Sequence, residues 1–234
     1  MTKGKLYIIP VPISEDTFHK VMPAYNAEVI KPIRIFVVEK LKTARQFLRK
    51  TDSFFPIDDC TFFELDKHDD YNFDKSVIQF LNDGKDVGLM SESGYAGVAD
   101  PGLKIISLAH KNNIQVIPLI GPSSIITALA ASGMNGQGFT FHGYLPKSGH
   151  ERIQKIKDLV TSIQKTGYAQ LFIETPYRNQ NLFEDLLKSV PDEIRLSVAY
   201  DITGALEFIK TKSISEWKKN PFEFDKMPCV FVMG

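Results

Sequence analysis

The loop at residues 91–102 carries the side chains best suited to chemistry. It follows the apolar run Val87–Met90 and places two acids, Glu92 and Asp100, among small residues. Glycines in such a loop let the main chain approach a ligand without interference from Cβ. A carboxylate at a strand end can bind a ribose diol, attract a cationic ligand or accept a proton. We therefore predict that Glu92 faces a ligand, and that Asp100 either faces the reacting group or caps the helix beginning at Leu103.

These residues require a framework in which strands and helices alternate. In the first half, we expect strands at 6–11, 33–38, 61–65, 87–90 and 115–119, and helices at 14–23, 41–48, 74–81 and 103–112. In the second half, we expect helices at 125–132, 147–164, 181–189 and 213–219, and strands at 139–144, 168–174, 195–200 and 229–233. This alternation is typical of α/β proteins. We predict two tandem α/β domains, 1–118 and 119–234, with a parallel sheet in the N-terminal domain and a mixed sheet in the C-terminal domain.

Small and polar residues follow many of the expected strands. Examples are Val11-Pro12, Gly121–Ser124, Thr175-Pro176, Ala199-Tyr200 and Met227-Pro228. Main-chain N–H and C=O groups at such breaks can recognise an adenine edge or an amino-acid moiety, as ligand sites at strand ends of α/β sheets do. Ser123 and Ser124 stand at the start of a helix, where N–H groups can hold a carboxylate. The spacing G-x-G-x-x-G is absent, which argues against a dinucleotide fingerprint.

The overall composition excludes several classes of protein. Hydrophobic residues make up 43% and charged residues 24%, which is usual for a globular protein. No apolar run approaches the roughly 20 residues needed to span a bilayer. The 28 basic and 28 acidic residues cancel, so the chain has no global field that would attract nucleic acid. Two distant cysteines and no metal-ligand spacing predict a cytoplasmic protein without a metal site.

Five segments resemble motifs of the tetrapyrrole methylase family of S-adenosylmethionine (SAM) methyltransferases. Residues 91–102 are similar to S-D-A-G-T-P-x-I-S-D-P-G, and residues 121–134 to G-P-S-A…A-L-x-A-S-G-L. Residues 142–147 resemble x-G-F-L-P-x-K, residues 174–178 resemble E-S-P-H-R, and residues 198–207 resemble V-A-R-E-L-T-K-x-x-E. The match runs in order along nearly the whole chain. The most similar branch methylates the cytidine ribose 2′-oxygen of small-subunit ribosomal RNA.

The resemblance implies two α/β domains with SAM in a cleft between them, usually in a homodimer. It implies cofactor contacts at Val11, Pro12, Glu92, Gly94, Tyr95, Ser123, Ser124, Thr175, Ala199, Met227 and Pro228. The reaction would be an in-line displacement in which the acceptor attacks the methyl group of the sulfonium. A base would help a ribose hydroxyl to react, and our candidates are Asp100 first and Glu39 second.

The basic residues near these motifs have two interpretations. Lys147 and Arg152 begin a charged helix that is either a solvated face or a contact for RNA. Arg178 either binds substrate with them or forms an (i, i+4) surface pair with Glu174. We predict Lys147, Arg152 and Arg178 as the substrate-binding residues.

The sequence departs from the family motifs mainly at polar positions. The motif E-D-T-R after the second strand reads Glu39-Lys40-Leu41-Lys42 here, and the lysine of L-T-K is replaced by Gly204. These changes fall on groups expected to meet the acceptor, whereas the small residues around the cofactor persist. We therefore predict a SAM-dependent methyltransferase, with ribosomal RNA ribose 2′-O-methylation first and a small-molecule acceptor such as a tetrapyrrole as the alternative. A SAM-binding module without catalysis is the alternative of another class.

Overall fold

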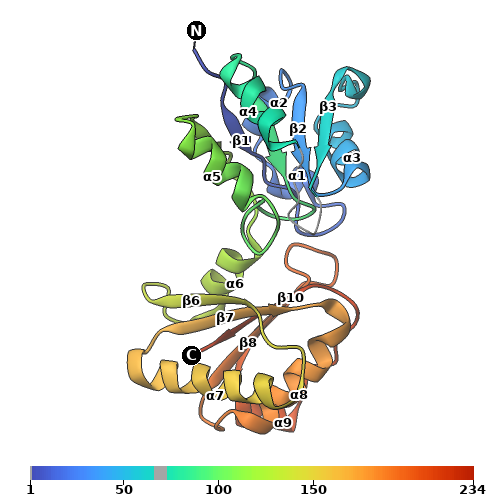
Figure 1. The fold of residues 1–234 in the computed structure, drawn as a ribbon. Coiled ribbons are helices and arrows are strands. Elements are labelled where there is room, and N and C mark those ends of the chain that lie inside the picture. The colour runs from blue at the N-terminus through green and yellow to red at the C-terminus, as the bar shows by residue number, and fades with distance from the viewer. Residues whose placement is uncertain (1, 66–72) are drawn as a thin grey trace. The chain divides into compact units, whose positions relative to one another are not determined.

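The computed structural model describes residues 2–65 and 73–234. The chain divides into two compact units, residues 1–123 and residues 124–234. Each unit contains one five-stranded sheet flanked by helices (Figure 1). Within the described ranges, no helix is long and apolar enough to cross a membrane.

The sheet of the first unit is parallel throughout. Its strands are β1 (Leu6–Ile8), β2 (Ile35–Val38), β3 (Thr61–Glu64), β4 (Val87–Met90) and β5 (Val116–Pro118), arranged in the order β3-β2-β4-β1-β5. Every residue of β2 and β4 is buried. Strands that are buried on both faces are expected where helices cover both sides of a parallel sheet.

Helices of the first unit supply both of these layers. They are α1 (Phe18–Val21), α2 (Ala24–Ile30), α3 (Leu41–Thr51), α4 (Asp74–Asn82) and α5 (Leu103–Lys111), with a 3₁₀ turn η1 (Ile57–Asp59). One hydrophobic cluster joins Leu81 of α4 and Ile105 of α5 to the sheet, and a second joins Ile30 of α2 and Phe47 of α3 to it. The carboxyl ends of the strands are thereby fixed at one edge of a packed three-layer unit.

The second unit has a mixed sheet. Its strands are β6 (Phe139–Tyr144), β7 (Ala169–Glu174), β8 (Arg195–Tyr200), β9 (Phe208–Ser213) and β10 (Cys229–Met233), in the order β6-β7-β10-β8-β9. Only β6 and β7 are parallel, and the other three pairings are antiparallel. The central strand β10 is buried along its full length.

Four helices and a 3₁₀ turn complete the second unit. They are α6 (Ser124–Ser132), α7 (Gly149–Thr166), η2 (Pro176–Arg178), α8 (Asn179–Ser189) and α9 (Ile214–Lys219). One core cluster joins Leu159 of α7, Leu186 of α8 and Trp217 of α9 to the sheet. The indole Nε1 of Trp217 donates a hydrogen bond of 2.8 Å to the carbonyl oxygen of Leu196 in β8, so the buried polar group has a partner. Helix α6 packs on β8, β9 and β10.

The predicted fold class is confirmed, and the main differences lie in three segments. The helix expected at 14–23 is only the short α1, and a further helix, α2, begins directly after Pro23. Proline disfavours a helical conformation in the residue before it but is compatible with a helix start, so it separates the two helices. The strand expected at 6–11 ends at Ile8, before Pro10. Strand β9 was not predicted.

Candidate functional site

Two loops at the carboxyl edge of the first sheet are joined by a main-chain bridge. The Val11 N–H donates to the Gly94 carbonyl at 2.9 Å, and the Gly94 N–H donates to the Val11 carbonyl at 2.9 Å. Gly94 has φ +64°, a left-handed conformation that favours glycine. This bridge brings the segment after β1, including Pro12, beside the loop after β4. Three predicted cofactor contacts are therefore neighbours in space.

Tyr95 connects the same loop to the segment after β5. Its hydroxyl donates to the Leu119 carbonyl at 2.9 Å and accepts from the Gly121 N–H at 2.8 Å. The departure from the family motif at this position thus has a structural consequence, because the side chain ties two strand-end segments together. Ser123 and Ser124, at the end of that segment and the start of α6, are both partly exposed.

Three carboxylates gather at the ends of β2 and β4. The Glu39 Oε2 atom accepts a hydrogen bond of 3.0 Å from the Glu92 N–H, and Lys40 Nζ lies 2.5 Å from Glu92 Oε2. The pKa of Asp100 is raised to about 6, chiefly because burial disfavours its charged form and also because Glu39 and Glu92 add like charge, while a hydrogen bond with Ser91 opposes the shift. The two candidate bases, Asp100 and Glu39, are therefore electrostatically coupled.

The interpretation of Asp100 as a helix cap is wrong. Helix α5 begins at Leu103, its N-cap is Gly102 with φ 130°, and no side chain caps it. The preceding residue, Ala99, has a φ of 63°, which is unusual for a residue with Cβ. Pro101 and Gly102 therefore separate Asp100 from the first residue of the helix. The carboxylate is not needed to satisfy the helix start.

The second unit also gathers predicted cofactor residues at one edge of its sheet. Because β10 is antiparallel to both β7 and β8, its first residue, Cys229, pairs with Glu174 and with Tyr200. The segments containing Thr175, Ala199 and Met227-Pro228 consequently meet. The Asp201 N–H donates to the Pro228 carbonyl at 2.9 Å, and Asn179 Nδ2 donates to the Met227 carbonyl at 3.0 Å.

Glu174 is a buried carboxylate at this edge. Its Oε1 atom accepts hydrogen bonds from the Thr175 N–H at 2.6 Å and from Arg178 Nε at 2.9 Å. Its Oε2 atom is buried and has no hydrogen-bond donor among the residues that the structure describes. The predicted (i, i+4) pair of Glu174 with Arg178 is present, but it is not a surface pair, because the Glu174 side chain is 0% exposed and that of Arg178 is 30% exposed. The free oxygen suits an N–H donor of a ligand.

The other predicted substrate residues have different surroundings. Arg152 is 4% exposed, pairs with Asp185 and donates from Nη1 to the Lys147 carbonyl at 2.7 Å. Its guanidinium therefore connects α7 to α8, whereas the Lys147 side chain is exposed. The described part of the chain contains no cluster of histidine, cysteine and acidic residues suited to a metal ion.

The glycine that replaces the family's lysine also has a structural setting. A Cβ at Gly204 would lie 2.1 Å from Asp201 Oδ1, and Asp201 is 2% exposed. The Oδ2 atom of Asp201 accepts a hydrogen bond of 2.8 Å from the Leu206 N–H. The loop after β8 therefore has no room for a side chain at position 204 while Asp201 keeps this place.

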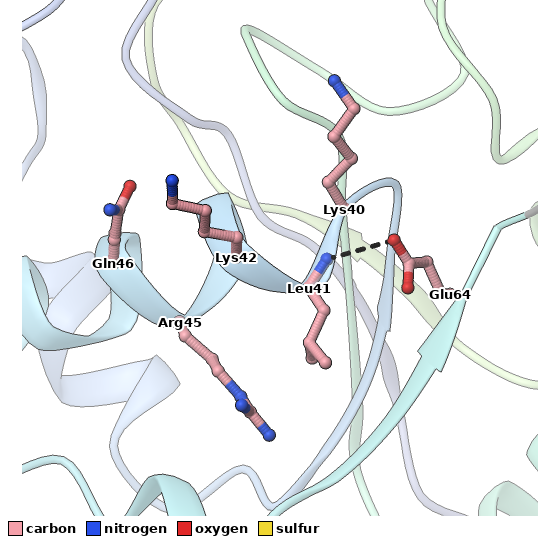
Figure 2. A pocket seen from close by; sticks show the side chains of 6 residues that line it. All are labelled: Lys40, Leu41, Lys42, Arg45, Gln46 and Glu64. Carbon is pink, nitrogen blue, oxygen red and sulfur yellow. Dashed lines mark hydrogen bonds between the residues drawn. The ribbon is translucent and has the colours of Figure 1, made fainter.

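Sequence reasoning missed Lys40 and the cavity next to it. Lys40, Leu41, Lys42, Arg45, Gln46 and Glu64 line a cavity of about 560 Å³ at the start of α3 (Figure 2). The available signal was the departure at residues 39–42, where the family motif E-D-T-R is replaced by a run with two lysines.

Comparisons with known proteins place this geometry in context. No family model matches the sequence. Ribosomal RNA small subunit methyltransferase I of Buchnera aphidicola subsp. Schizaphis graminum is 29% identical over 222 residues, covering 92% of this chain and 73% of the relative. The protein of the same name from Vibrio cholerae is 28% identical over 213 residues, covering 90% of this chain and 69% of the relative. The one from Escherichia coli O157:H7 is 25% identical over 217 residues, with 92% and 71% covered.

Two solved structures share the fold. CobJ, a methyltransferase, superposes with a TM-score of 0.64 at 16% identity, over 99% of this chain and 94% of that one. Uroporphyrin-III-C-methyltransferase from Thermus thermophilus has a TM-score of 0.56 at 14% identity, with the same coverage. The resemblance drawn from the five motifs is thereby confirmed: along most of its length the chain is similar in sequence to these ribosomal RNA methyltransferases and in fold to these two methyltransferases.

Proposed function

We propose that this chain is a SAM-dependent methyltransferase whose acceptor is a ribose 2′-oxygen of ribosomal RNA. The sequence relatives carry the name of a small-subunit ribosomal RNA methyltransferase, and the fold neighbours are methyltransferases. The observation that carries the proposal is a cluster of three carboxylates, Glu39, Glu92 and Asp100. The cluster lies at the carboxyl edge of a parallel sheet, where α/β proteins bind small ligands.

The residues at both sheet edges fit the chemistry of SAM. The carboxylates of the first unit suit a cationic ligand with ribose hydroxyls, and the buried Oε2 of Glu174 suits an N–H donor. We propose that the cofactor contacts are Val11, Pro12, Glu92, Gly94, Tyr95 and Ser123 in the first unit, and Ser124, Thr175, Ala199, Met227 and Pro228 in the second. When bound, SAM supplies an electrophilic methyl group.

The protein's own chemical task is to position the acceptor and remove its proton. A carboxylate whose pKa is about 6 is a better base near neutral pH than an ordinary aspartate and is still mostly ionised there. We assign this role to Asp100. Glu39 is the second candidate, but one of its oxygens already accepts the Glu92 N–H, and its charge helps to raise the pKa of Asp100.

Asp100→Asn tests this assignment. We expect the variant to bind SAM as the wild type does, and to transfer methyl at least about 100-fold more slowly, because a general base contributes roughly 10²–10⁴-fold. SAM binding is measured by calorimetry, and transfer by incorporation of tritium into small ribosomal subunits that lack the mark. Asp58→Asn, at an exposed acid of the same unit, is the matched control. Unchanged transfer by Asp100→Asn contradicts the assignment.

The same assay separates the alternative functions. The neutral net charge and the internal pairing of Arg152 favour an acceptor smaller than ribosomal RNA as the second candidate. SAM binding with transfer to a tetrapyrrole, and none to ribosomal subunits, would support that candidate. Binding without transfer to either would support a SAM-binding module. We further propose, from the family resemblance, a cytoplasmic homodimer.

A further inference from the structure

The exposed face of α3 concentrates positive charge on a chain that is neutral as a whole. Helix α3 contains no acidic residue, and its exposed side chains include Lys42, Arg45, Arg49 and Lys50. The whole chain has 28 basic and 28 acidic residues. The opposite face of the helix is apolar and buried in the core through Ala44, Phe47 and Leu48. The charge excess is therefore local and faces solvent.

Most of this charge has no acidic partner. Within the described residues, Lys42, Arg45 and Arg49 form no ion pair, and Lys50 lies 3.6 Å from the exposed Asp16. The Arg45 guanidinium lies over the Phe62 ring of β3, 5.5 Å from its centroid, a contact that limits its motion. In Figure 2, the Lys42 and Arg45 side chains, which both line the cavity, leave the helix in different directions.

The spacing of these cations suits a repeating anion. Residues 42, 45 and 49 follow one another at intervals of three and four positions, so they lie on the same face of the helix. Neighbours at this spacing are about 5–6 Å apart at Cβ, which forms a row that can contact successive phosphates. A cavity of about 560 Å³ at the beginning of the row gives one phosphate and its sugar room to enter.

The row begins beside the carboxylates of the candidate site. Lys40, which immediately precedes α3 and lines the cavity, is held by its ion pair with Glu92. A ribose hydroxyl is attached to the same backbone as its phosphates. A backbone bound along α3 would therefore bring ribose groups toward the carboxylates.

We propose that the cavity and the face formed by Lys42, Arg45 and Arg49 bind the sugar–phosphate backbone of single-stranded RNA. This inference rests on the proposed function for the identity of the acceptor. Among the residues that the structure describes, Glu64 is the one acid that lines the cavity, and its Oε1 atom lies 3.4 Å from the Leu41 nitrogen. It opposes an incoming phosphate, and its removal should strengthen binding.

The test compares two triple variants of the full chain. The first is Lys42→Gln with Arg45→Gln and Arg49→Gln. The matched control, with the same charge change, is Lys157→Gln with Lys165→Gln and Lys188→Gln at exposed positions of α7 and α8. Binding of a fluorescein-labelled single-stranded RNA is followed by anisotropy over a series of KCl concentrations.

We expect the α3 triple variant to bind RNA roughly 100-fold more weakly at about 0.1 M salt, with a salt slope that is smaller by about 2, because each lost phosphate contact removes about 0.7 from the slope. The control triple should stay close to the wild type. Glu64→Gln should bind RNA about two- to fivefold more tightly, the effect of one exposed like charge.

Three results would overturn the inference. They are an unchanged slope in the α3 triple, an equal or larger loss in the control triple, and a wild type that binds no RNA at low salt. A wild type that binds an acidic protein through this face, but binds no RNA, counts as the third of these results. SAM calorimetry on every variant separates this failure from failure of the proposed function. A wild type that binds RNA through α3 but does not bind SAM refutes the methyltransferase and leaves the RNA surface standing.

Discussion

At the scale of single residues, Asp100 depends most clearly on its surroundings. Burial and the neighbouring Glu39 raise its pKa from 3.8 to about 6, so the folded protein holds a proton on this carboxylate at pH values where an unfolded chain does not. At pH values between these two pKa values, the carboxylate takes up a proton when the chain folds. The free energy of unfolding must therefore fall as the pH rises from about 4 to above 6, because ionisation in the folded state is unfavourable.

Replacement by asparagine should reveal this cost. We expect Asp100→Asn to be more stable than the wild type by about 1 kcal/mol at pH 8, less than the full shift implies because part of the side chain reaches solvent. Below about pH 4, both side chains are neutral in the folded state, and the difference should vanish. Urea unfolding at both pH values measures the effect. A variant that is less stable than the wild type at pH 8 would contradict the electrostatic account.

Sequence reasoning found Asp100 and Glu92 but could not show how they are held. The hydrogen bond from the Glu92 N–H to Glu39 depends on β2 and β4 being neighbours, although they are separated in the chain by β3 and α4. Strand order is a property of the whole sheet. The sequences of the segments around Glu39 and Glu92 do not indicate that order.

At the scale of elements, the pairing of α7 with α8 depends on a charged contact. Arg152 reaches from α7 to Asp185 in α8 and to the Lys147 carbonyl. The side-chain exposures of Arg152 and Asp185 are 5% and 23%. Removing one member of such a pair leaves the other with an unpaired charge that is largely shielded from water.

We expect Arg152→Ala to lower the free energy of unfolding by about 2–3 kcal/mol, slightly below the range for fully buried pairs because Asp185 retains some solvent. Lys157→Ala, at an exposed position of the same helix, should change it by less than about 0.5 kcal/mol. Chemical denaturation monitored by circular dichroism gives both values. If Arg152→Ala is as stable as the wild type, the ion pair does not stabilise the fold, and Arg152 is again a candidate for substrate binding.

Most elements could be predicted because their boundaries carry clear signals. The strands β4, β6, β8 and β10 have the predicted bounds, because β4 and β10 are apolar runs and β6 and β8 begin with alternating apolar and polar residues. Strand β9 was missed because only Phe208 and Ile209 of its six residues are apolar and two others are lysines. It also follows a loop with no obvious turn motif. Helix α2 was missed because Pro23 was interpreted only as a stop.

At the scale of the whole molecule, ligand binding should increase the free energy of unfolding. If SAM binds the folded chain and not the unfolded one, a concentration about 100 times its Kd adds about 2.7 kcal/mol. For a chain of this size, that corresponds to a Tm increase of roughly 5–10 °C. Scanning calorimetry with SAM and with its demethylated product, against adenosine as a control, measures the shift. A Tm that neither SAM nor its demethylated product changes would contradict the proposed cofactor.

The position of Trp217 determines what such experiments can observe. It is the one tryptophan of the sequence, and it is 1% exposed in the second unit, stacked edge-on against Phe183. Intrinsic indole emission therefore reports on the environment of residues 124–234, while residues 1–123 contain only weaker tyrosine emitters. A fluorescence melt would register damage around α9 and β8 directly. It would require an added chromophore, such as a tryptophan placed at Phe62, to follow the half of the chain that contains Asp100.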